Sequence, residues 1–228
     1  MPKKTLTFTF DNGPTPGATG TVLDFLAARG IQATFFVVGD QLADPAGRAL
    51  VQRAHSEGHW IGNHTLTHGK PLGIDGNLER VRREIGETER LLGGLAHPQK
   101  FFRPNGAGEI GPHLLSPAAR DYLTENRFTV VTWNNVPGDW IAPHTDWFDA
   151  ALATVDALDW SVLVLHDPFI ARMTDLLARF CDELVRRDVA IVQDFPPSCI
   201  LLDRGVPTGP LDAFVSDASI ADPAYDHN

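Results

Sequence analysis

The sequence is poor in cysteine and has no long hydrophobic run. Its two cysteines among 228 residues are Cys181, in a helical pattern, and Cys199, beside Pro196-Pro197, so no disulfide framework is indicated. No window approaches the roughly 18 apolar residues of a membrane-spanning helix. The N-terminus also lacks the apolar core of a signal peptide. We therefore expect a cytoplasmic protein without a membrane partner.

Positive charge is also scarce. The chain has 19 Lys and Arg residues against 29 Asp and Glu residues, which gives a formal net charge of -10. This balance argues against nucleic acid or anionic lipid as the main partner. It leaves a neutral substrate open. With 43% hydrophobic and 21% charged residues, the composition is that of an ordinary globular protein.

Short apolar strands and amphipathic helices alternate along most of the chain. This alternation is typical of parallel strands covered by helices, in either a barrel or a doubly wound sheet. The expected strands are Leu6–Phe10, Ala33–Val38, Trp60–Gly62, Phe101–Arg103, Phe128–Trp133, Ser161–Leu165 and Val189–Val192. The expected helices end near Arg29 and cover about 45–57, 78–92, 114–126, 148–158 and 173–187.

The pattern fades from about Leu202 into Gly, Pro, Asp and Ala. We therefore predict a catalytic domain over residues 1–200 and a mobile tail over residues 201–228.

Two histidines, His64 and His68, are spaced i, i+4. On a helical turn this spacing places both imidazoles on one side, where they can bind one metal ion. Alternatively, one histidine caps or faces solvent and the other packs in the core.

Polar residues follow one predicted strand after another. In parallel α/β folds the carboxyl ends of the strands meet at one face, which carries the active site. We therefore expect convergence on one cavity of Asp11 and Asn12, His64 and His68, Arg103, Asp139 and Trp140, and His166.

These segments resemble a known family. The five ordered motifs of polysaccharide deacetylases (the NodB-homology group, carbohydrate esterase family 4) are similar to Thr9–Pro14, His64–His68, Phe102–Pro104, Pro137–Trp140 and Leu163–Asp167. The resemblance extends from about Thr5 to Phe195. It implies an α/β fold, the distorted (β/α)7 barrel, and metal-assisted hydrolysis of the acetamide of an N-acetylated sugar.

The resemblance also implies a role for each matching residue. Asp11 matches the general base and His166 the general acid, while Arg103 matches the arginine that holds the base and Asp139 the carboxylate that tunes the acid. The metal-site positions are Asn12, His64 and His68, and the substrate-pocket positions are Trp140, Val164 and Pro104. The implied cofactor is a divalent metal, Zn²⁺ first, with Co²⁺ or Ni²⁺ as alternatives.

Three segments depart from the family pattern. Asn12 replaces the metal-binding aspartate, so a neutral amide oxygen takes the place of an anionic ligand. The segment Arg103–Gly106 lacks the tyrosine whose backbone N–H helps to form the oxyanion hole. The acidic residues that often precede the fourth motif are replaced by Asn134, Asn135 and Val136. We expect weak metal occupancy.

Structural roles remain open for the same residues. Asp11 and Asn12 suit a polar turn, and Arg103 and Asp139 suit a structural ion pair. His166 and Trp140 suit a packed core. Glu109 is a further candidate for the missing carboxylate.

Three functions compete on this sequence. The leading hypothesis is an amidohydrolase that deacetylates an N-acetylated amino sugar or oligosaccharide. The second is a metal-independent hydrolase of cyclic amides. The third is a pseudoenzyme that binds a sugar or a partner without turnover, which Asn12 favours.

Overall fold

The computed structural model describes residues 3–217. The chain forms two compact units, each assembled from separate stretches of sequence. The first unit contains the residues up to Val37, Gln41–Ile61 and Trp133–Cys199. The second contains Val38–Asp40, Gly62–Thr132 and the residues from Ile200 onward.

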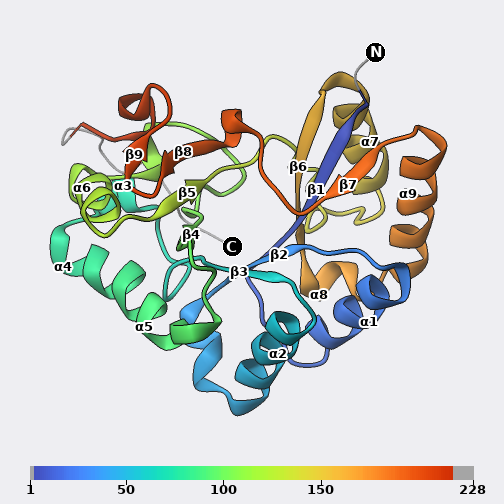
Figure 1. Cartoon of the computed structure of the whole chain (residues 1–228), viewed down its shortest axis with the longest axis horizontal. Helices are drawn as coiled ribbons and strands as arrows, with labels where there is room; N and C mark the ends of the chain where they lie inside the picture. Colours follow the sequence, from blue (N-terminus) through green and yellow to red (C-terminus); the bar gives the residue numbers. More distant parts are fainter. Residues whose placement is uncertain (1–2, 218–228) are drawn as a thin grey trace. The chain divides into compact units, whose positions relative to one another are not determined.

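The sheet of the first unit consists of parallel strands (Figure 1). Its central strand β1 (Thr5–Asp11) pairs in parallel with β2 (Thr34–Val37), β6 (Trp160–His166) and β7 (Ala190–Val192). Nearly every residue of β1 is buried, on both faces of the strand. Burial on both faces is what a parallel strand covered by helices requires.

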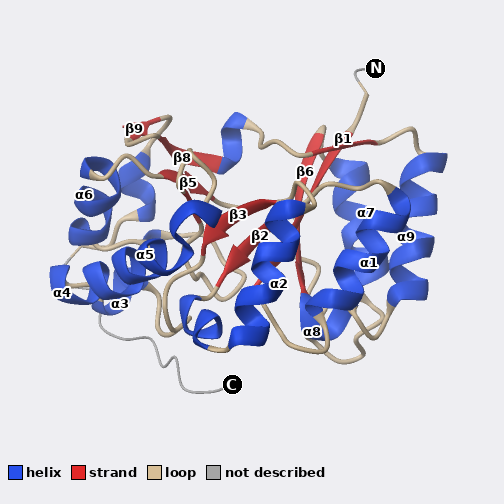
Figure 2. Cartoon of the chain, turned by 60° about the horizontal axis from the view of Figure 1, so that its bottom comes forward, coloured by secondary structure: helices blue, strands red, loops and turns tan. Residues whose placement is uncertain are grey.

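Amphipathic helices pack against one another in the first unit. The helices are α1 (Thr19–Arg29), α2 (Pro45–Ser56), α7 (Trp147–Ala157), α8 (Asp167–Ile170) and α9 (Thr174–Arg186). Helix α9 buries Leu177, Phe180, Cys181 and Leu184, which recur at helical spacing. The rings of Phe180 and Trp147 lie 5.3 Å apart, and Figures 1 and 2 show α7 and α9 side by side. This contact between two buried rings joins α7 to α9.

The sheet of the second unit mixes parallel and antiparallel pairs. Asn63, at the end of β3 (Trp60–Asn63), pairs in parallel with β4 (Phe101–Phe102), and β4 pairs in parallel with β5 (Thr129–Val131). Strand β8 (Ile200–Asp203) pairs antiparallel with β5 and with β9 (Val206–Pro207).

A helical segment with a π-helical centre runs through the second unit. The helices are α3 (Leu72–Asp75), α4 (Leu78–Val81), α5 (Thr88–Leu92) and α6 (Pro117–Glu125), and a π-helical segment, Arg82–Glu87, joins α4 to α5. Short 3₁₀ turns lie at Gly39–Ala43, Gly93–Leu95, Pro112–Leu114, Pro197–Cys199 and Leu211–Phe214.

All seven predicted strands are present, so the predicted α/β class is confirmed. The helix predicted over residues 78–92 is present, but its middle is π-helical. The prediction that regular structure ends near Leu202 is wrong for the residues up to 217. Leu202 and Leu211 are buried, and a two-residue turn at Arg204 and Gly205, both with positive φ, joins β8 to β9 as a hairpin. Residues 218–228 lie outside the described part of the chain, and the mobility predicted for them stays a prediction.

Among residues 3–217, no helix is long and apolar enough to cross a membrane. Cys181 and Cys199 are both buried thiols. Burial raises the pKa of the Cys181 thiol to about 11, so this side chain is a packing residue at neutral pH.

Candidate active site

Asp11 and His166 lie at equivalent positions on adjacent strands of the first unit. They are register partners at the ends of β1 and β6. Adjacent strands are ~4.8 Å apart, and paired residues on parallel strands project to the same face. Asp11 is 4% exposed, and its charge contributes to raising the pKa of His166. The first and last motifs therefore supply a carboxylate and an imidazole to one sheet edge.

Asp139 holds His166 through two hydrogen bonds. Its Oδ2 accepts the backbone N–H of His166 at 2.8 Å, and its Oδ1 accepts Nδ1–H of the ring at 2.8 Å. A carboxylate accepts only, so the Nδ1 proton stays in this bond and the titrating proton is on Nε2. Burial by itself lowers the pKa of His166, but the hydrogen bond and charge of Asp139, with the charges of Asp11 and Asp167, outweigh it and raise that pKa. The arrangement favours a protonated Nε2, which is the state of a general acid.

Trp140 and Val164 lie next to this imidazole. The Trp140 ring meets the His166 ring edge to face, with centroids 4.9 Å apart. Val164 is two residues before His166 on β6, so both side chains project to the same face of the strand. Of the three residues predicted for the substrate pocket, Trp140 and Val164 therefore lie beside the predicted acid.

Asn12 has a left-handed backbone and a buried amide oxygen. Its φ is 69°, a conformation that asparagine tolerates better than most residues. Its Oδ1 is buried without a hydrogen-bond partner among the described residues. A buried acceptor without a partner carries an energetic penalty that a cation would relieve. The Oδ1 atom of Asn12 is therefore suited to bind a metal ion, although the amide group is neutral.

Asp167 is a buried carboxylate to which the sequence reasoning gave no role. It is fully buried, and Thr19 Oγ1 donates to its Oδ2 at 2.5 Å. Burial raises its pKa to about 6, and the bond from Thr19 opposes this rise. A Cβ on Gly13 would lie 2.4 Å from Asp167 Oδ2, so a larger residue at position 13 would have to displace this carboxylate. The sequence feature that points to Asp167 is its position directly after His166, in the fifth motif.

The histidine pair of the second unit lies on an irregular loop. The predicted helical turn is wrong, because Thr65 (φ 68°) and His68 (φ 52°) both have left-handed backbones. The loop nevertheless brings the rings of His64 and His68 together, with centroids 4.9 Å apart. His64 Nδ1 lies 2.8 Å from the carbonyl oxygen of Arg103 and must donate to it. His64 therefore has its lone pair on Nε2, as a metal ligand requires.

Arg103 and Asn105 each form a hydrogen bond with the segment that contains the histidine loop. Arg103 is fully buried, and its guanidinium donates to the carbonyls of Val131 and Thr132 at the end of β5. Asn105 donates to the carbonyl of Gly69 at 2.6 Å. Pro104 between them is buried. The altered third motif thus stabilises the backbone just after His68.

The first unit brings together Asp11, Asp139, Trp140, Val164 and His166, and it also contains Asn12. The second brings together His64, His68 and Arg103, followed by Pro104. Convergence of the two groups on one cavity stays a prediction.

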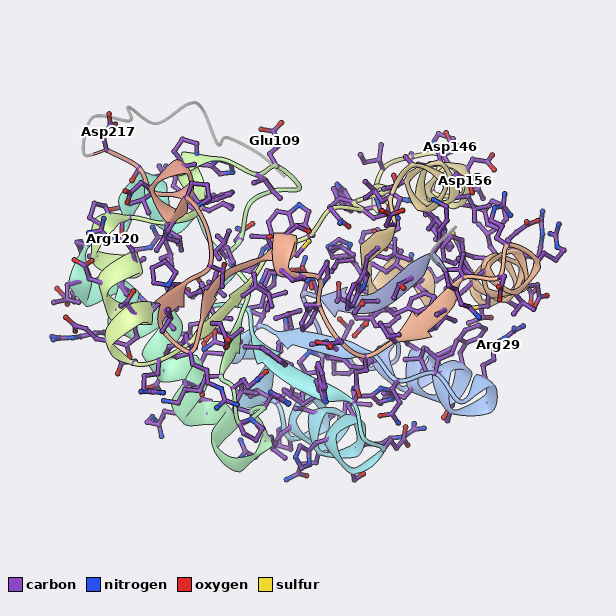
Figure 3. All side chains as sticks on the ribbon, turned by 45° about the horizontal axis from the view of Figure 1, so that its top comes forward. Arg29, Glu109, Arg120, Asp146, Asp156 and Asp217 are labelled. Atoms are coloured by element: carbon purple, nitrogen blue, oxygen red, sulfur yellow. The ribbon has the colours of Figure 1, made fainter. Side chains whose placement is uncertain are left out.

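Among residues 3–217, no three His, Cys, Asp or Glu side chains cluster as metal ligands. The two imidazoles of the second unit are suitable metal ligands by type, and neither carries a negative charge. Glu109 is exposed and projects away from its loop (Figure 3), so it does not have the buried environment of a charged ligand.

Comparisons with known proteins agree on one family. The family model described as polysaccharide deacetylase matches residues 1–122. A chitooligosaccharide deacetylase of Rhizobium leguminosarum bv. phaseoli is 38% identical over 63% of this chain, and the match spans 60% of that protein's length.

Two solved structures share the fold. The Bc1960 peptidoglycan N-acetylglucosamine deacetylase is 28% identical, with a TM-score of 0.67 over 89% of this chain and 90% of that one. A family 4 acetyl xylan esterase from Clostridium thermocellum, in complex with a cobalt ion, is 27% identical, with a TM-score of 0.66 over 83% and 88%. The predicted NodB-homology fold is thereby confirmed. The motifs, the fold and these matches together place the chain in the polysaccharide deacetylase family of enzymes.

Proposed function

We propose that this chain hydrolyses the acetamide of an N-acetylated amino sugar or a short oligosaccharide. The observation that carries this proposal is the doubly hydrogen-bonded pair of Asp139 and His166, next to Asp11 and Trp140. The names of the relatives support this substrate class, since they are deacetylases of chitooligosaccharide and of peptidoglycan N-acetylglucosamine.

His166 acts as the general acid. An amine is a poor leaving group unless it is protonated as the C–N bond breaks. Nε2–H is the proton that His166 can give, because Asp139 retains the proton on Nδ1. The raised pKa of His166 increases the fraction of the imidazole that carries this proton.

Asp11 acts as the general base. It accepts a proton from the attacking water, and the water oxygen bonds to the carbonyl carbon of the acetamide. Arg103 is proposed to hold this carboxylate, as the family's third motif implies. Trp140 and Val164 are proposed to contact the acetyl methyl group through their apolar surfaces.

A divalent metal, Zn²⁺ first, is proposed to bind His64, His68 and Asn12. When bound, it supplies Lewis-acid polarisation of the amide carbonyl. Two observations support this assignment: the lone pair on His64 Nε2, and the Oδ1 of Asn12, which has no hydrogen-bond partner within residues 3–217. The acetyl xylan esterase of the same fold, which was solved in complex with a cobalt ion, supports the proposal of a metal.

A binding protein with little turnover is the second candidate, and Asn12 favours it. Without a carboxylate among the proposed ligands, the site lacks a full negative charge to hold a cation. The two candidates are separated by acetate release from chitotetraose in the presence of excess Zn²⁺. Release that depends on Asp11, tested with Asp11→Asn, supports the deacetylase. Binding of chitotetraose without release, at any Zn²⁺ concentration, would support the binding protein. A metal-independent hydrolase of cyclic amides would instead open dihydrouracil or hydantoin in the presence of a chelator.

A further inference from the structure

The loop that carries His64 and His68 has a strained backbone. Thr65 has φ of 68° and His68 has φ of 52°. Left-handed backbone is uncommon outside glycine, although asparagine, aspartate and histidine adopt it more often than other residues, and it is a clear outlier for a β-branched residue such as Thr65. Such a conformation is energetically unfavourable and persists only where the surroundings enforce it. Some group in the second unit must therefore hold this loop.

Glu84 is that group. Its Oε2 accepts the backbone N–H of Leu66 at 3.1 Å and that of Thr67 at 3.0 Å. The hydroxyl of Thr67 lies 3.1 Å from both carboxylate oxygens. The side chain is almost completely buried, with 4% of its residue surface exposed. Hydrogen bonds from backbone N–H groups to a buried carboxylate are among the stronger ones in proteins. The two residues between Thr65 and His68 are thus attached to a single anion.

The π-helical segment Arg82–Glu87 connects this anion to the start of the loop. Asn63 Nδ2 donates to the carbonyl of Ile85 at 2.9 Å, while Asn63 Oδ1 accepts the N–H of Thr65 at 3.0 Å. Residues 84 and 85 of one π-helical turn therefore hold the loop through two separate contacts. Single π-turns inside α-helices occur often at functional sites. Here the π-helical segment contributes both a side chain and a backbone carbonyl to the same loop.

We propose that Glu84 is a positioning residue that holds His64–His68 in the conformation in which both imidazoles bind one divalent ion. This inference rests on the proposed metal site. Glutamate suits the role because one carboxylate oxygen accepts two adjacent N–H groups. In glutamine, the amide oxygen can take the position of Oε2, but it carries no full charge and accepts the two N–H groups more weakly.

The test compares Glu84→Gln with Glu87→Gln. Glu87 lies on the same π-helical segment, but its carboxylate pairs with Arg90 at the surface. Both variants remove one negative charge from the segment, and only the first disturbs the loop. Amide hydrogen exchange at Leu66 and Thr67 is measured in metal-free protein, and Zn²⁺ affinity is measured by calorimetric titration. For Glu84→Gln we expect exchange at least ~10-fold faster and Zn²⁺ affinity about 10-fold weaker. Glu87→Gln should match the wild type in both.

Three results would overturn the inference: unchanged exchange in Glu84→Gln, unchanged Zn²⁺ affinity in Glu84→Gln, or equal losses in the two variants. If Glu84→Gln does not fold, Thr67→Val removes only the hydroxyl contact and should show the same two changes at smaller size. A Thr67→Val protein identical to the wild type would also count against the role. A wild-type protein that binds no Zn²⁺ would refute the metal assignment of the proposed function, whereas exchange in the metal-free variants reports separately on the loop.

Discussion

The imidazole of His166 and those of His64 and His68 are held in two different ways. His166 ends a regular strand, and one carboxylate accepts both its backbone N–H and its ring Nδ1–H. The other two histidines lie on a strained loop, whose backbone N–H groups are bonded to Glu84 and Asn63. The proposed proton donor is thus fixed by one carboxylate that bonds to both its ring and its backbone. The proposed metal ligands are fixed mainly through the backbone of their loop, and His64 is fixed also by the bond from its ring to the carbonyl of Arg103. A proton donor needs a defined tautomer and pKa, whereas a pair of ligands needs a defined separation.

Among the predicted effects on activity, the loss of kcat on removal of His166 should be the largest. His166→Ala removes the proton donor for the leaving amine, so kcat should fall by about 10²–10⁴-fold. Zn²⁺ affinity should not change, because the proposed ligands lie elsewhere in the sequence. Acetate release and calorimetric titration on the same preparation check both. An undiminished kcat would remove His166 from the mechanism.

Addition of a negative charge to the proposed metal ligands should strengthen Zn²⁺ binding. Asn12→Asp keeps the shape of the side chain and adds a full negative charge. Zn²⁺ binding should tighten by at least ~10-fold, about 1.4 kcal/mol, and acetate release from a chitooligosaccharide should rise. Calorimetric titration of both proteins with Zn²⁺ checks the affinity. Equal affinities would show that the neutral ligand is no handicap.

Loss of the charge on Asp139 should move the pH profile without removing the acid. His166 must be protonated to act, so activity falls as the pH rises through its pKa. The hydrogen bond and charge of Asp139 raise that pKa, so Asp139→Asn should lower it and move the alkaline limb of kcat to lower pH. The kcat–pH profiles of the two proteins decide the point. An alkaline limb at the same pH in both would assign that limb to another group.

Asp167 should have the smallest effect on activity and a measurable one on stability. Its pKa is 3.8 ordinarily and about 6 in the fold, so the folded protein holds the proton more tightly. Stability therefore falls as the pH rises through this window, by at most ~3 kcal/mol at about 1.4 kcal/mol per pKa unit. Asp167→Asn should gain stability relative to the wild type between pH 4 and pH 7. Urea unfolding at both pH values measures this. The exposed Asp156, which pairs with Arg187, provides the control Asp156→Asn, which should show no such gain.

Much of the fold could be predicted because its elements are local patterns. The alternation in β1 and the spacing of buried residues in α9 are properties of short segments, and caps such as Ser116 before Pro117 mark helix ends. The hairpin of β8 and β9 was missed because its Arg204-Gly205 turn signal is weak and its strands are short. The burial of Leu202 comes from pairing with β5, more than 70 residues earlier in the chain.

The sequence by itself determined which chemical groups this protein has and on which strand ends they lie. The ordered motifs identified Asp11, His166 and the histidine pair, because residue type and order do not depend on packing. Tertiary structure alone decided how those groups are held. The loop at His64–His68 departs from the helical turn that its spacing suggested, because Asn63 and Glu84, up to 20 residues away from His64, satisfy its backbone. The pKa values of His166 and Asp167 likewise depend on burial and on neighbours from distant segments, Asp139, Asp11 and Thr19. Long-range contacts set the electrostatic environment, and no local pattern specifies it.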